Sequence, residues 1–63
     1  MKFIEFHLQG RPRLFRIANI QVVAPWKNYE KIEVSQVYMV GEESPWEVDE
    51  DYEKVKRLLH LED

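Results

Sequence analysis

An amphipathic helix near the end of the chain constrains the fold more than any other feature of this sequence. From Asp49 onward, apolar residues recur at helical spacing and form one stripe: Tyr52, Val55, Leu58 and Leu59. Asp49 is a favoured N-cap, acids crowd the first turn, and Lys, Arg and His occupy the later turns, as the helix dipole favours. The sequence therefore predicts a helix that begins at Asp49 and needs an apolar surface to cover.

The preceding residues are expected to supply that surface as β-strands. Alternating apolar residues indicate strands over residues 3–8, 13–17, 20–24, 31–40 and 46–48. Gly and Pro mark turns at residues 9–12 and 41–45, and Ala18-Asn19 indicates a kink. Because Pro25 cannot donate to a sheet, we expect the third strand to end there and residues 26–30 to form an exposed loop.

The strand over residues 31–40 is the longest in the chain, and alternation gives it two distinct faces. Alternation places five residues on one of them: Ile32, Val34, Gln36, Tyr38 and Val40. We expect this face to point toward the helix, with a β-bulge near Ser35 and Gln36 that accommodates the polar Gln36. Val37 and Met39 then lie on the outward face.

These elements predict an α+β fold: a small antiparallel sheet of four or five strands, with one C-terminal amphipathic helix packed on one face. The 63 residues form a single domain over residues 1–63. A core this small rarely contributes more than roughly 3–5 kcal/mol, and cysteine is absent, so neither disulfides nor thiolate-bound metals can add to it. A partner chain is the remaining common source of extra stability.

The sheet face that the helix does not cover is the predicted interface. Alternation assigns five apolar residues to it: Phe3, Leu14, Val23, Val37 and Met39. Trp26 and Tyr29 join this set, because large aromatics in loops are enriched at protein contacts. We expect a homodimer, or docking to another protein. In the competing interpretation the sheet curls over these side chains, with Trp26 as the lid.

Charge is distributed unevenly along the chain, whose net charge is −3. Residues 1–31 carry six Lys and Arg against two Glu, a net charge of +4, whereas residues 32–63 carry three against ten acids, a net charge of −7. We expect the two halves to attract each other, with Arg11, Arg13 and Arg16 paired to acids of the second half. The alternative function is nucleic-acid binding through these three arginines, beside aromatic Phe3 and Phe15.

The sequence predicts no catalytic, cofactor or metal site, and no small-molecule substrate. Glu5 and His7 share a strand face, but no third metal ligand accompanies them, and capping explains the acids from Asp49 to Glu53. Ser35 and Ser44 are the only serines, and neither lies in a glycine elbow. No apolar run approaches the roughly 20 residues of a membrane span, so we expect a cytoplasmic protein without a membrane partner.

The order of elements resembles the short flagellar FlbD-like proteins. The resemblance rests on the opening strand Phe3-Ile4-Glu5-Phe6, on Asn19-Ile20 leading into a strand, and on the stretch from Trp46 to Val55, in which a strand runs into an acidic helix start. It departs from the family in the middle, where a longer strand and the turn at residues 41–45 replace a tight Gly-containing hairpin. The resemblance implies the fold described above and no catalytic residue.

Overall fold

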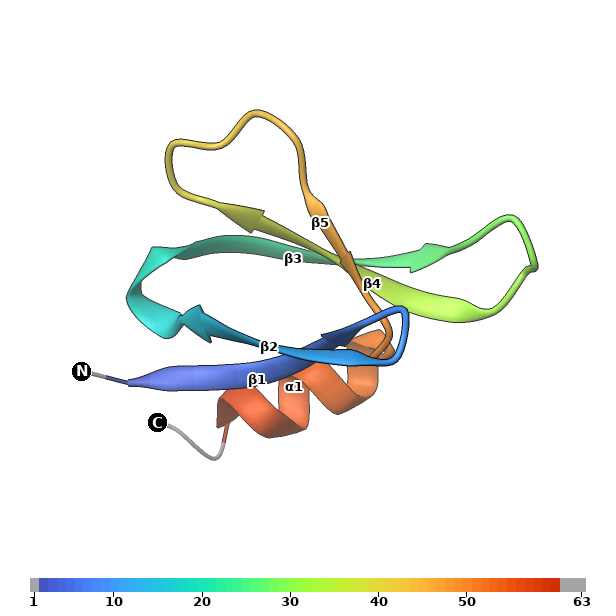
Figure 1. Ribbon diagram of the computed structural model, residues 1–63, viewed down its shortest axis with the longest axis horizontal. Coiled ribbons are helices and arrows are strands. Elements are labelled where there is room, and N and C mark those ends of the chain that lie inside the picture. Colours follow the sequence, from blue (N-terminus) through green and yellow to red (C-terminus); the bar gives the residue numbers. More distant parts are fainter. Residues whose placement is uncertain (1, 61–63) are drawn as a thin grey trace.

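The chain forms five antiparallel strands in two small sheets, followed by one C-terminal helix (Figure 1). The computed structural model describes residues 2–60. Strands β1 (Phe3–Leu8) and β2 (Arg11–Arg16) form one sheet, and β3 (Ile20–Lys27), β4 (Glu33–Met39) and β5 (Trp46–Val48) form the other, in the order β3-β4-β5. The predicted α+β class is confirmed, with the strands divided between two sheets instead of joined in one.

A tight turn and a short helix explain this division. Gln9 and Gly10 both have positive φ, 51° and 82°, and such a two-residue turn matches the twist of a β-hairpin. The 3-10 helix η1 (Ile17–Asn19) then redirects the chain, as the predicted kink at Ala18-Asn19 requires. The backbone ladder of β1 and β2 is therefore not continued into β3. Figure 1 shows the hairpin and the three-stranded sheet as separate ribbons joined by η1.

Strand β3 extends further than the sequence predicts. Pro25 does not end it, because Trp26 pairs with Val34 and Lys27 pairs with Glu33 of β4. Only one side of β3 is paired within the sheet, and a proline is tolerated in such an edge strand. Trp26 is consequently a strand residue, and the loop begins at Asn28.

The core lies between the two sheets and the helix. Its buried apolar members come from β1, β2, β4, β5 and the helix: Ile4, Phe6, Phe15, Val37, Met39, Val48 and Val55. The ring centroids of Phe6 and Phe15 are 5.3 Å apart, and Trp46 meets Phe15 edge-on at 5.6 Å. Such contacts add to the burial of large aromatic side chains, which dominates the energy of a core this small.

Helix α1 (Tyr52–His60) begins later than predicted, with its N-cap two residues after Asp49. The side-chain oxygen Oδ1 of Asp51 accepts the backbone N–H of Lys54 at 2.8 Å, so Asp51 is the N-cap. The predicted apolar stripe is confirmed, because Val55 is buried and Leu58 and Leu59 pack against the core. Asp49 precedes the helix and has a different role, described below.

The predicted inward face of β4 is wrong except at Val34, which is buried. Val37 is fully buried and Met39 nearly so, whereas Ile32 and Val40 are exposed. The expected bulge at Ser35 and Gln36 is also absent; the irregularity in the ladder lies in β3, between Ile20 and Val22. With the opposite phase, Gln36 needs no bulge, since alternation places it on the outward face.

Candidate interaction surfaces

The predicted interface is not one continuous surface. Phe3 and Leu14 are exposed and lie on the outward face of the hairpin, as predicted. Val23 is half-buried and packs against the core, while Val37 and Met39 belong to the core itself. The proposed surface is therefore incorrect for these three residues, because α1 covers the side of β4 that the sequence interpretation left uncovered.

The uncovered surface of the three-stranded sheet consists instead of the opposite set of side chains. Register and alternation place four uncharged strand residues there, Val22, Ala24, Gln36 and Tyr38, and Val40 directly follows β4; we call these five residues the outer patch. On the same face Glu47 of β5 pairs with Gln36, and Trp26 pairs with the buried Val34. Val22 is 49% exposed and Val40 is 60% exposed, although both are apolar. Val22 pairs directly with Tyr38, so their side chains are neighbours across the two strands.

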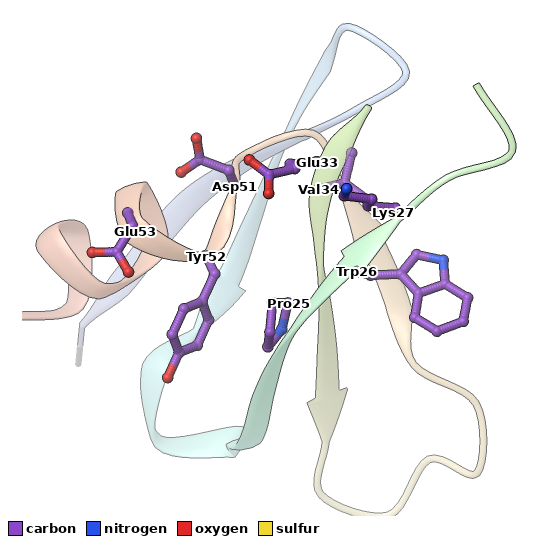
Figure 2. Close-up of a pocket in the computed structure, with 8 residues that line it drawn as sticks. All are labelled: Pro25, Trp26, Lys27, Glu33, Val34, Asp51, Tyr52 and Glu53. Carbon is purple, nitrogen blue, oxygen red and sulfur yellow. The ribbon is translucent and has the colours of Figure 1, made fainter. Parts of the chain in front are cut away.

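Trp26 and Tyr29 lie at the other end of this sheet, and both are exposed. In Figure 2 the Trp26 indole points away from Tyr52 and the helix, while Pro25 lies toward Tyr52. The expected lid formed by Trp26 is therefore not observed. Pro25, Trp26 and Tyr52 line a hollow of about 400 Å³ between β3, β4 and the start of α1, together with the acids Glu33, Asp51 and Glu53 (Figure 2).

The loop after β3 is held in shape by Asn28. Its side-chain oxygen accepts the N–H groups of Glu30 and Ile32 at 2.9 and 3.1 Å, and its backbone carbonyl accepts that of Lys31 at 2.8 Å. Lys31 has a φ of 64°, which completes the tight return of the chain. This bonded loop presents Tyr29 at its tip with 94% of the residue exposed.

The three arginines are separated by the alternation of β2. Arg11 and Arg13 share a side of the strand with buried Phe15, and they line an open groove of about 1060 Å³ with Trp26, Lys27 and Tyr29. Arg16 lies on the opposite face, with its guanidinium 6.0 Å from the ring centre of Phe3. No signal in the sequence places two of these arginines beside the loop that carries Tyr29.

The expected pairing of these arginines with acids of the second half is wrong. Within residues 2–60, Arg11, Arg13 and Arg16 form no ion pair. The acids before the helix bind backbone amides instead. The carboxylate of Asp49 accepts the N–H groups of Gln9 and Gly10 at 3.1 and 2.8 Å, and so fastens the β1–β2 turn to the end of β5.

Glu50 forms the second half of this connection. It is only 6% exposed, and its carboxylate accepts the backbone N–H of His7 at 2.9 Å and meets Nδ1 of the same histidine at 2.6 Å. The hydrogen bond to Glu50 raises the pKa of His7, partial desolvation opposes the rise, and the charges of Glu50, Glu5 and Asp49 add to it. The protonated imidazole is thus the favoured partner of the buried carboxylate.

The geometry around His7 is that of a structural link. Nε2 of His7 lies 3.7 Å from the Glu5 carboxylate, and Nδ1 is already engaged by Glu50. Within the described part of the chain, no group of three or more His, Asp or Glu side chains could hold a metal ion.

Ser35 is fully buried without a hydrogen-bond partner for its hydroxyl. No helix among residues 2–60 is long and apolar enough to cross a membrane.

Comparison with known proteins adds no relative to these observations. No family model matches the chain, and neither a curated protein nor a solved structure matches it.

Proposed function

We propose that this domain is a non-enzymatic interaction module that associates with a second copy of itself through the outer patch. The observation that carries this proposal is the exposure of apolar Val22 and Val40 on the sheet face that α1 does not cover. Soluble domains rarely leave a contiguous apolar surface open to water unless another molecule contacts it. The same face holds Tyr38, a residue type enriched at protein contacts.

A second copy suits this patch because its five residues are uncharged, and the charged Glu47, which pairs with Gln36, lies beside it on the edge strand β5. A two-fold contact places the same residues opposite each other in both chains, so a charged patch would repel itself, whereas an uncharged one does not. The small core gives a further reason. A contact between two copies adds apolar burial that a 63-residue chain cannot obtain alone.

The resemblance to the FlbD-like proteins is in keeping with this role, because it implies the layout of strands and helix and no catalytic residue. We include the cytoplasm in the proposal as the place where the module acts. The chain contains no cysteine, so its fold is independent of an oxidising compartment.

The experiment is light scattering on the wild type and on a Val22→Lys, Val40→Lys double variant. We expect a dimer for the wild type at tens of micromolar, and a monomer for the variant, because two lysines from each copy would face each other across the two-fold axis. Leu14→Lys is the matched control: Leu14 is 67% exposed, but it lies on the hairpin outside the outer patch. A wild type that remains monomeric contradicts self-association.

A further inference from the structure

We propose that the groove lined by Arg11, Arg13, Trp26, Lys27 and Tyr29 binds single-stranded nucleic acid. This inference goes beyond self-association and concerns the other end of the three-stranded sheet. It begins from a juxtaposition that the fold alone creates, since the two arginines belong to β2 and the two aromatics lie on β3 and on the loop that follows it.

The three cations of the groove are not paired with any acid in the described part of the chain. Within residues 2–60, Arg11, Arg13 and Lys27 form no ion pair, although the chain as a whole is acidic. Of the two acids that line the groove, Asp49 is already engaged by the N–H groups of Gln9 and Gly10. The cations are therefore available to phosphate oxygens, which arginine and lysine bind through charge-assisted hydrogen bonds.

The aromatics favour a nucleic acid over an acidic polypeptide. Trp26 is half exposed and Tyr29 is almost fully exposed, and the hydrogen bonds of Asn28 hold the loop so that the tyrosine stays in water. A flat ring in solvent beside a free cation can stack on a base while the cation binds the backbone of the same strand. An acidic peptide would use the cations and leave both rings without a matching surface.

The shape of the groove favours a single strand over a duplex. It is open to solvent and has a volume of about 1060 Å³, at the upper end of the range for drug-sized ligands, so it has room for more than one unpaired nucleotide. Stacking on Trp26 and Tyr29 requires bases with free faces, which a duplex does not offer. Its remaining acid, Glu47, limits the expected affinity.

The test uses fluorescence anisotropy of labelled oligothymidylate, about 15 nucleotides long, at about 50 mM salt. We expect saturable binding that weakens about 20-fold between about 50 and 200 mM salt, because three phosphate contacts on a single strand give a log–log slope of about −2. Arg11→Gln with Arg13→Gln should make that slope shallower, about −0.7, since one phosphate contact remains. Tyr29→Ala should weaken binding at least about fivefold through lost stacking.

Arg16→Gln is the matched control, because Arg16 lies on the opposite face of β2 beside Phe3. It should leave both the affinity and the salt slope unchanged. Absence of binding at low salt would overturn the proposal, and so would equal losses from the Arg16 variant and the double variant. If polyglutamate of matched charge displaces the labelled oligothymidylate as well as unlabelled oligothymidylate does, the proposal is also overturned, in favour of an acidic protein partner.

Discussion

The phase of β4 can be tested with two valines that differ in burial, one within the strand and one directly after it. Val37 is fully buried in the core, and Val40, which follows the last strand residue Met39, is 60% exposed. Replacing each by alanine removes the same atoms from opposite environments. The structure therefore predicts unequal losses of stability, whereas the inward face predicted from sequence alone requires Val40 to be the more sensitive residue.

The expected magnitudes follow from burial. Removal of two methylene equivalents from a fully buried side chain costs about 1.6 kcal/mol of transfer free energy, and the cavity that remains raises the total for Val37→Ala to about 2–3 kcal/mol. Because Val40 loses less than half of its solvent exposure on folding, Val40→Ala should lower the free energy of unfolding by less than about 0.7 kcal/mol. For a domain whose total stability is roughly 3–5 kcal/mol, the first variant should be close to unfolding.

Urea denaturation followed by tryptophan fluorescence measures both values. With a slope of about 1 kcal/mol per molar urea, Val37→Ala should lower the midpoint by about 2–3 M and Val40→Ala by well under 1 M. Self-association is controlled by comparing the two variants at one low protein concentration, because a dimer contact at Val40 would otherwise contribute to its loss. Equal midpoints, or a larger loss from Val40→Ala, would refute the assigned phase.

Three further predictions concern polar groups. Asp51→Ala should lower the free energy of unfolding by about 1 kcal/mol through loss of the N-cap bond, and Asp51→Asn should restore most of it; a silent Asp51→Ala in thermal denaturation would contradict the observed helix start. Ser35→Ala should raise stability by about 1 kcal/mol, and the melting temperature by about 4–8 °C, because it removes a buried hydroxyl without a partner; a lower melting temperature would show that the hydroxyl is bonded. The pKa of His7 is raised from 6.5, so the stability contributed by its link to Glu50 should be fully present below pH 6.5 and lost as the pH rises through the folded-state pKa of His7. Glu50→Gln should abolish this loss. Urea midpoints that run parallel for the wild type and the variant from pH 5 to 9 would disprove the link.

Local chemistry was sufficient to predict the elements of this fold. The turn at Gln9 and Gly10 requires residues that tolerate positive φ, and the apolar stripe with acids before it and bases after it requires a helix near the end of the chain. These features depend on neighbours within a few residues. The sequence could therefore determine the α+β class, the order of the elements and the presence of exposed aromatics at Trp26 and Tyr29.

Tertiary structure alone decided which side of each element meets the core. Both faces of β4 carry apolar residues, Val37 and Met39 on one and Tyr38 on the other, so alternation could not choose between them; the helix did, by covering the first pair. Likewise, Asp49 has a good N-cap side chain, but the β1–β2 turn offers two free amides that lie far away in sequence and close in space. Its carboxylate binds these amides and leaves the cap to Asp51, and such a choice between local and distant partners is made only when the chain is folded.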